Sequence, residues 1–378
     1  MKIESAVLCT WIGTVGLGAL AVAPADAQLS SNAEVYVSGL AGPRGLKFGP
    51  DGLLYVAEAG FGGSTSTKSV CTQVIPPIGP YYGGSTARIS KIDRNGNRVT
   101  VASGLPSTVD SNVPVADYMG VADVAFLEGK LYAVTAGGGC SHGNVSVPNG
   151  VVEVDTRTGK WKMVANLSSF IKAHPAAYTD EADFEPDGSF YSLIAVRDRL
   201  LAVEPNHGQI FSIWPNGQIR EEIDISLSEG HIVPTVVAEH EGSLLVGNLG
   251  LFPITPNATK ILTLRPEWLP GPAPGLEPLA DLGQLRVAGS RAGFATITAI
   301  EIGPDGLLYV LEMSPAAGYP TPGAGKVVRL NRKSEIEDVA TGLSVPTGMT
   351  FGPDGHLYVS NFGAAPPGAG EILRISVD

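Results

Sequence analysis

Six polar residues stand at equivalent places in a repeated motif, and they are the first candidates for chemistry in this chain of 378 residues. Each one ends the second apolar segment of a repeat, at Glu58, Thr135, Glu204, Asn248, Glu312 and Asn361. If these positions converge, three carboxylates and two amides meet, and like charges at close range must take up protons or hold a cation. Oxygen-only ligands favour a hard cation such as Ca²⁺. We therefore predict that the six residues bind a ligand together, with Glu58, Glu204 and Glu312 as metal ligands and Ca²⁺ as the candidate cofactor.

The same six positions have a structural alternative, in which each side chain caps its own loop. Short polar side chains routinely accept hydrogen bonds from nearby backbone N–H groups. Two more residues join the predicted ligand-binding set. Arg44 stands at the start of the first strand of a repeat, and His207 stands in the loop after Glu204.

The repeats that carry these residues have the sequence pattern of hairpins. Residues 35–58 and 338–361 share the same order of turn signals, including Phe-Gly-Pro-Asp-Gly-x-Leu-Tyr-Val, and residues 300–312 are a third copy. Weaker copies cover residues 124–135, 193–204 and 236–248. Each of the six copies consists of an apolar strand, a tight turn and a second apolar strand, which is the signal of a β-hairpin.

Two further strands follow most of the hairpins, as at residues 88–93 and 99–105. Four short strands repeated six times predict an all-β chain that forms a six-bladed β-propeller with four-stranded blades. The chain begins with a fourth-strand motif at residues 35–40 and ends on a third strand at residues 372–375. We therefore expect the N-terminal strand to complete the last blade and close the ring, which removes two sheet edges. The alternative, two β-sandwiches in tandem, fits the even repeat less well.

The first 27 residues have the pattern of a secretory signal peptide. Lys2 precedes an apolar run over residues 6–23, and Ala25-Asp26-Ala27 is a small-x-small cleavage site. We expect cleavage after Ala27, which leaves residues 28–378 as one propeller domain in the periplasm or outside the cell. The alternative is an uncleaved N-terminal anchor. After cleavage, no apolar run is long enough to span a membrane.

Two cysteines remain after cleavage, Cys71 and Cys140, in long loops of neighbouring blades. In an oxidising compartment they are candidates for a disulfide, which we predict, with two free thiols as the alternative. The chain has no CxxC motif, which excludes zinc ribbons and thioredoxin-like redox sites. A net charge of −12 without a basic tract excludes nucleic acid as a partner. We expect a monomer.

The long loops all leave the predicted ring on one face, which we call the top face. They follow the second strand of a blade or precede its first strand, and those of the first kind cover residues 59–86, 136–149, 249–259, 313–325 and 362–370. Long loops on a rigid scaffold are where binding sites usually lie. Their aromatic residues suit a shallow apolar platform, at Phe61, Tyr81, Tyr82, Phe252, Tyr319 and Phe362.

Other polar residues near these loops are weaker candidates. Four histidines fall in top-face segments without the spacing of a metal site, at His142, His174, His207 and His231. Residues 139–143 match G-x-S-x-G, but that motif needs a strand–turn–helix context. Residues 180–188 form an acidic loop that lacks the final glutamate of an EF-hand. His240 and His356 lie beside tight turns of the opposite face, and we expect them to be surface residues without a role in binding.

The segment from Pro43 to Glu58, Pro-x-Gly-Leu-x-Phe-Gly-Pro-Asp-Gly-x-Leu-Tyr-Val-x-Glu, resembles NHL-type propellers. More narrowly, the chain is similar to the ScyD/ScyE family of exported proteins, named for genes of scytonemin pigment biosynthesis. The similar segments include residues 120–126, 233–235, 247–253 and 309–312. This resemblance implies a six-bladed fold and export, and it implies no reaction. Residues 206–209, Asn-His-Gly-Gln, depart from the Gly-rich turn usual in that family.

Two classes of function fit these features. The first is an exported binding or accessory protein that holds a small aromatic or hydrophobic metabolite, or a protein partner, on its top face. The alternative is a calcium-dependent hydrolase of the lactonase or gluconolactonase type, acting at the central channel. In those hydrolases the metal ligands cluster where the chain starts the first strand of each blade. This sequence has few ligating residues there, since the matching positions are Arg44, Ala122, Tyr191, Thr235, Thr298 and Thr347, with only Asp123 nearby. We therefore favour the binding protein.

Overall fold

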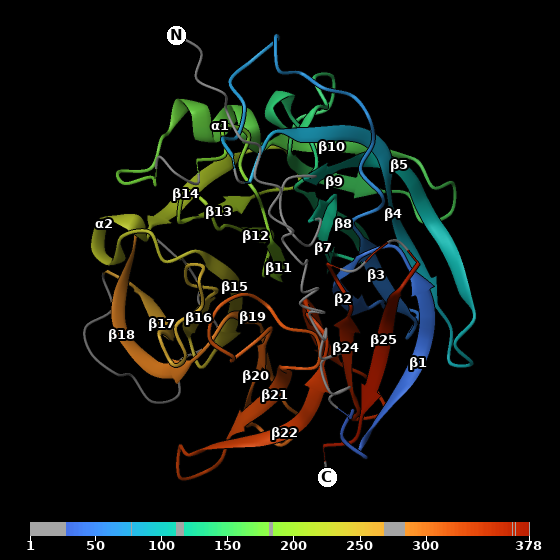
Figure 1. Cartoon of the computed structure of the whole chain (residues 1–378), viewed down its shortest axis with the longest axis vertical. Coiled ribbons are helices and arrows are strands. Elements are labelled where there is room, and N and C mark those ends of the chain that lie inside the picture. Colours follow the sequence, from blue (N-terminus) through green and yellow to red (C-terminus); the bar gives the residue numbers. More distant parts are fainter. Residues whose placement is uncertain are drawn as a thin grey trace, which may run out of the picture.

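The computed structural model describes residues 28–76, 78–110, 117–180, 184–267, 284–364, 366 and 368–377. The predicted signal peptide and two acidic-loop residues, Glu181 and Asp183, lie outside these ranges. The described chain forms six antiparallel sheets arranged as blades around a central axis (Figure 1). The predicted all-β, six-bladed propeller is therefore confirmed.

The first three blades follow one another along the chain. Blade 1 contains β2 (Pro43–Phe48), β3 (Leu54–Glu58), β4 (Tyr81–Ile92), β5 (Arg98–Asp110) and the short β6 (Tyr118–Met119). Blade 2 contains β7 (Val121–Leu127), β8 (Lys130–Thr135), β9 (Gly150–Val154) and β10 (Trp161–Asn166). Blade 3 contains β11 (Ser192–Val196), β12 (Arg199–Glu204), β13 (Gln209–Ile213) and β14 (Ile219–Asp224). The fifth strand of blade 1 is an addition to the predicted four-stranded pattern.

The remaining blades complete the ring. Blade 4 contains β15 (Pro234–His240), β16 (Ser243–Asn248), β17 (Thr259–Pro266) and β18 (Leu285–Phe294). Blade 5 contains β19 (Ile297–Ile302), β20 (Leu308–Glu312), β21 (Gly325–Leu330) and β22 (Ile336–Leu343). Blade 6 contains β23 (Gly348–Phe351), β24 (Leu357–Asn361), β25 (Gly370–Ile375) and the N-terminal β1 (Ala33–Leu40). Short helices in the loops are η1 (Cys140–His142), α1 (Leu167–Ala173) and α2 (Ser226–Glu229).

The two ends of the described chain meet in blade 6, as predicted. β1 pairs antiparallel with β25, from Ala33 opposite Ile375 to Leu40 opposite Gly370. In addition, the Asn32 side-chain amide donates to the Ser376 carbonyl at 2.8 Å. This closure removes the free edges that an open array of blades would expose. Figure 1 shows β1 beside β25, on the outer side of the last blade.

The repeated order of turn residues has a direct structural reason. In the Pro-Asp-Gly turns the glycine has a positive φ, which a residue with a Cβ adopts at a cost. The Asp51 carboxylate accepts the Leu53 backbone N–H at 3.2 Å and the Tyr55 hydroxyl at 3.0 Å. The same pair of bonds recurs in the turns that begin at Asp305 and Asp354. The tyrosine can therefore be buried between blades with its hydroxyl satisfied.

Apolar side chains between neighbouring blades form the core, and the first strand of each blade faces the central axis. The top-face loops therefore stand on a continuous, well-packed support. Within the described ranges, no helix is long and apolar enough to cross a membrane.

Candidate functional site

The six strand-end residues of the predicted ligand-binding set are all buried, and three of them make the same bond in different blades. Glu58 accepts the backbone N–H of Ala41 at 2.7 Å. Glu312 accepts the N–H of Ala295, and Asn361 that of Ser344, both at 2.7 Å. In each case the donor precedes the acceptor by 17 residues and belongs to the segment before the first strand of the same blade. These side chains cap their own blades.

The other three strand-end residues also bond within their own blades. Glu204 accepts the N–H of Ser189 at 2.7 Å and that of His207. Asn248 donates to the Ile232 carbonyl at 2.8 Å and accepts from the N–H of Lys260. Thr135 exchanges two bonds with the backbone of Gly150. The capping alternative describes all six positions.

The three glutamates do not fit a shared cation, in contrast to the sequence-based expectation. Arg88 bonds to Glu58 at 2.7 Å, and Lys326 lies 3.7 Å from Glu312. Burial raises the pKa of Glu312 although the Ala295 N–H and Lys326 oppose it. Among the residues that the structure describes, no group of three or more His, Cys, Asp or Glu side chains is placed to hold a metal ion.

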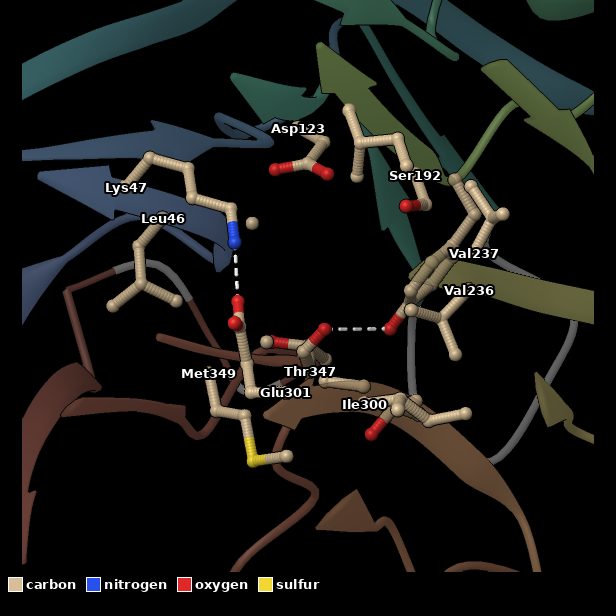
Figure 2. Close-up of a pocket in the computed structure, with 16 residues that line it drawn as sticks. Leu46, Lys47, Asp123, Ser192, Val236, Val237, Ile300, Glu301, Thr347 and Met349 are labelled. Carbon is tan, nitrogen blue, oxygen red and sulfur yellow. Dashed lines mark hydrogen bonds and ion pairs between the residues drawn. The ribbon is translucent and has the colours of Figure 1, made fainter. Parts of the chain in front are cut away.

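The central channel contains the charged residues that come closest to a polar site on the axis. A cavity of about 40 Å³ is lined by first strands of the blades and contains Lys47, Asp123, Ser192 and Glu301 (Figure 2). Lys47 of β2 forms an ion pair with Glu301 of β19. Burial opposes the charge on Lys47, but the contact with Glu301 outweighs it and raises the pKa of the lysine. Lys47 is therefore charged at neutral pH.

Asp123 lies against the backbone of Gly45 in the wall of the same cavity. Its carboxylate accepts the backbone N–H groups of Val124 and Leu193, each at 2.8 Å. Burial raises the pKa of Asp123 to about 7, although the N–H of Leu193 and the charge of Lys47 oppose the shift. A carboxyl that exchanges its proton near neutrality is a candidate for chemistry or for ligand binding.

The top end of the channel is crossed by side chains that bond to the protein itself. The Tyr191 hydroxyl donates to the Thr347 carbonyl at 2.8 Å, from blade 3 to blade 6. Arg44, predicted to bind ligand, pairs with Asp117 at 2.9 Å. Thr235 and Thr347 donate to backbone carbonyls of neighbouring blades at 2.6 Å. The positions at which lactonase-type hydrolases are expected to carry ligands therefore hold the blades together.

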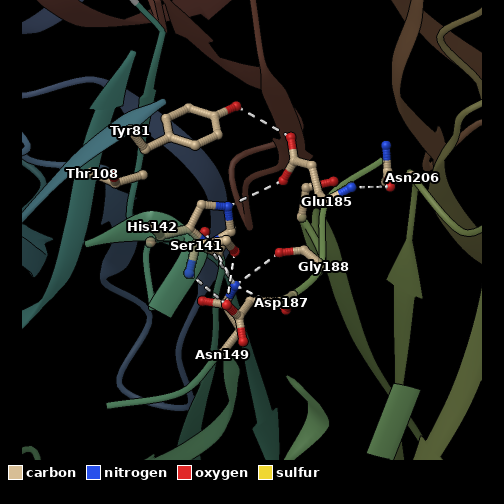
Figure 3. Close-up of polar contacts among 12 residues, drawn as sticks. Tyr81, Thr108, Ser141, His142, Asn149, Glu185, Asp187, Gly188 and Asn206 are labelled. Carbon is tan, nitrogen blue, oxygen red and sulfur yellow. Dashed lines mark hydrogen bonds and ion pairs between the residues drawn. The ribbon is translucent and has the colours of Figure 1, made fainter. Parts of the chain in front are cut away.

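A buried polar cluster joins blades 1, 2 and 3 on the top face (Figure 3). His142 approaches the Glu185 carboxylate at 3.2 Å, and the Tyr81 hydroxyl donates to the same carboxylate at 3.2 Å. Burial opposes the charge on His142, but the hydrogen bond and charge of Glu185 outweigh it and raise the pKa of the histidine. His207 joins through its Nε2, 3.0 Å from the Glu185 carbonyl. Two of the four top-face histidines thus meet here.

The G-x-S-x-G segment belongs to this cluster and has no free nucleophile. The Ser141 hydroxyl donates to Asp187 at 2.7 Å rather than to His142, and both Ser141 and His142 are completely buried. Lys172 pairs with the same Asp187 at 2.5 Å. Next to this turn, Cys140 forms the predicted disulfide with Cys71, with Cα atoms 6.3 Å apart. The acidic loop and the disulfide therefore fix the loops of blades 1 to 3.

The predicted aromatic platform is only partly formed. Tyr81 is 2% exposed, because its hydroxyl reaches the buried Glu185, so it is not part of a surface platform. Phe252 and Tyr319 are exposed, at 44% and 69%, and their rings stack with centroids 6.3 Å apart and planes 19° apart. Phe61 is also exposed, whereas Tyr82 and Phe362 are intermediate. The surface aromatic pair therefore belongs to the loops of blades 4 and 5.

The ion pair between Lys47 and Glu301 was not predicted from the sequence, although the repeat contains a pattern that indicates it. Lys47 and Glu301 occupy the same place in two copies of the repeat, two residues before the Gly-Pro-Asp-Gly turn. Charged residues on a strand that faces the axis of a ring can be expected to meet there, even 254 residues apart. For Glu185 and Asp187 no such signal exists, because their partners come from loops.

Comparisons with known proteins show the fold. No protein-family model matches the chain, and no curated protein matches its sequence. A Thermus thermophilus protein assigned as an oxidoreductase (glucose dehydrogenase) is similar in structure, with 19% identity, a TM-score of 0.53 and coverage of 92% of this chain and 100% of that one. A gluconolactonase of Xanthomonas campestris has 10% identity, a TM-score of 0.52 and coverage of 91% and 89%.

A third similar structure is an auxiliary nutrient binding protein of Bacteroides thetaiotaomicron, with 10% identity, a TM-score of 0.52 and coverage of 93% of this chain and 73% of that one. At these identities the similarity concerns the arrangement of the blades, and one fold carries many functions. The chain is thus a six-bladed β-propeller protein, and its fold resembles that of gluconolactonase structures.

Proposed function

We propose that this chain is an exported binding protein of the ScyD/ScyE type, which holds a small planar aromatic or hydrophobic molecule on its top face. The signal-peptide pattern of residues 1–27 and the disulfide between Cys71 and Cys140 support export, because disulfides persist in oxidising compartments. The mature protein is expected to begin at Gln28, which N-terminal sequencing of exported protein tests.

The exposed aromatic pair is the observation that carries this proposal. Phe252 follows β16 and Tyr319 follows β20, so each ring comes from a top-face loop of a different blade. Backbone bonds in both directions between Ile254 and Gly318 tie the two loops together, and Ile254 is buried beneath them. Two nearly parallel rings fixed by their backbones are pre-organised for a flat ligand, because little freedom is lost on binding.

The hydrolase is the less supported candidate for geometric reasons. Its predicted ligands Glu58, Glu204 and Glu312 accept backbone N–H groups of their own blades. Asp123 follows Ala122, one of the positions where such enzymes are expected to bind metal, and its carboxylate accepts two backbone N–H groups. Similarity to a gluconolactonase in fold alone does not supply the missing ligands.

The test uses N-phenyl-1-naphthylamine, a neutral aromatic dye whose fluorescence rises in apolar surroundings. Aromatic contacts contribute about 0.5–1.5 kcal/mol each, so removing both rings by F252A/Y319A should weaken dye binding by about fivefold or more. Y178A is the matched control, because Tyr178 is 61% exposed in a different loop, the one before blade 3. Equal dye affinity for the wild type and the double variant would place the binding site elsewhere.

A further inference from the structure

The opposite end of the channel holds a larger cavity that none of the sequence motifs indicated. Its volume is about 370 Å³, within the usual range for small-molecule sites of about 300–1,000 Å³. The residues around it end the first strands, next to the tight turns, and include Phe48, Phe126, Ala195, Glu239 and Ile302. We call this the outer chamber. It opens on the face opposite the aromatic pair.

The smaller cavity of about 40 Å³ lies one layer further in, and we call it the inner chamber. The two chambers share wall residues, among them Lys47, Ile194 and Glu301, so they lie next to each other along the channel. The inner chamber has room for a few water-sized groups. Its polar wall is formed by Asp123, Ser192, Glu301 and Lys47 (Figure 2). Beyond it, the bond from Tyr191 to Thr347 crosses the channel.

The charges of the inner chamber are not balanced when all groups are ionised. Lys47 is the one cation among its lining residues, and two carboxyls, Asp123 and Glu301, face it. Lys47 contacts Glu301, so Asp123 is the carboxyl without a cation of its own, and burial favours its protonated form. A second small cation in this chamber would replace that proton.

We propose that this end of the channel is a binding site for an organic amine, with its ammonium group in the inner chamber beside Asp123 and its apolar body in the outer chamber. The ammonium is about the size of a water molecule and donates three hydrogen bonds, which Asp123, Glu301 and the Ser192 hydroxyl can accept. The walls of the outer chamber, with Phe48, Phe126 and Ile302, suit an apolar or aromatic body. This site is separate from the aromatic pair of the top face.

The experiment compares three probes of one shape and different charge: 2-phenylethylamine, 2-phenylethanol and 3-phenylpropionate. Titration calorimetry at pH 7.5 should show the amine binding at least tenfold more tightly than the alcohol, because a charge-assisted bond to a carboxylate is stronger than a neutral one. The carboxylate probe should not bind. At pH 6, amine binding should also release a proton, seen as a dependence of the enthalpy on the buffer.

Three variants separate the site from a general effect on folding. D123N should reduce the preference for the amine over the alcohol to less than about twofold and abolish proton release. A195W fills the outer chamber at an exposed position and should weaken amine binding while leaving Asp123 intact. E241Q, in an exposed turn of the same face, is the matched control and should bind like the wild type.

Equal binding of amine and alcohol, or no amine binding up to about 10 mM, would overturn the proposal, since such affinity is negligible. Displacement of the amine by Ca²⁺ with unchanged binding in A195W would also overturn it and indicate an ion site. Loss of the dye in F252A/Y319A is a separate result, because the two chambers do not include those residues.

Discussion

Gly45→Ala should destabilise the protein through one specific contact in the channel. A Cβ at this position would lie 1.8 Å from Asp123 Oδ1 and 2.3 Å from its Cγ, far inside van der Waals distance. The Asp123 side chain would have to move, and it would lose the bonds from the Val124 and Leu193 N–H groups. Each lost bond to a buried carboxyl costs about 1–2 kcal/mol, which gives a loss of about 2–4 kcal/mol in unfolding free energy.

The measurement is a double-mutant cycle by urea unfolding at pH 7. Gly45 has no positive φ, so alanine can adopt its backbone conformation. Glycine inside a β-strand is in general less stable than alanine, because it loses more conformational freedom on folding. In an Asp123→Gly background, which removes the clashing atoms, Gly45→Ala should therefore cost less than about 0.5 kcal/mol or stabilise slightly. The coupling energy between the two sites should be about 2 kcal/mol or more.

An equal cost of Gly45→Ala in both backgrounds would refute this reasoning. It would mean that the alanine acts on the strand itself rather than through the carboxyl of Asp123. Gly348→Ala serves as a comparison at the equivalent position of blade 6, where the neighbouring atoms belong to the backbone of Arg44 and Gly45. Its cost should not depend on the residue at position 123.

Three further predictions concern the disulfide, one titration and the glutamates. Replacing Cys71 and Cys140 by serine should lower the unfolding free energy, measured by urea unfolding, by about 2–4 kcal/mol. The reason is that the disulfide joins residues 69 positions apart and so restricts the unfolded chain. An unchanged unfolding free energy would mean that other contacts fix these loops. The stability difference between Asp123→Asn and the wild type should shift in favour of the variant as the pH rises from about 4 to about 7, and should stay level above that. Over this window the folded Asp123 keeps its proton, with a pKa of about 7, whereas an unfolded carboxyl has lost it near pH 4, so the wild type loses stability and the variant does not. A difference that stays constant between about pH 4 and about pH 7 would contradict this. A chelator should leave the melting temperature unchanged, because Glu58, Glu204 and Glu312 bond to their own blades; a drop by several degrees would restore the metal hypothesis.

The fold could be predicted because its signals are local and repeated. The Pro-Asp-Gly turn, the tyrosine four residues after its aspartate and the strand-end polar residue recur together, and the structure gives each a bond within one hairpin. The closure by β1 could also be read from the strand order of the repeat. The position of the Cys71–Cys140 bond followed from the adjacency of two blades.

The candidate site was less predictable, because side-chain direction at a strand end is not set by the repeat. The sequence allows two directions for the side chains of Glu58, Glu204 and Glu312, either towards the central axis or towards the loops of their own blades. They point to the loops because backbone N–H groups before each first strand need an acceptor, and the carboxylates supply it. Tyr81 was misplaced on the surface for a similar reason, since its partner Glu185 comes from a loop 104 residues later.

The residue pairs on which the two proposals depend are also far apart in the sequence. Lys47 meets Glu301 only because blades 1 and 5 face one channel, and Asp123 fits only because Gly45 has no side chain. Phe252 and Tyr319 meet because backbone bonds join their loops. Such contacts depend on the ring as a whole.

The most direct test of the proposed top-face function is a crystal structure of the protein soaked with 6-bromo-2-naphthol, a flat aromatic with an anomalous scatterer. The account predicts a bromine peak beside the stacked rings of Phe252 and Tyr319, and no peak there in crystals of F252A/Y319A. A bromine peak at any other place on the protein, with the aromatic pair free, would contradict it.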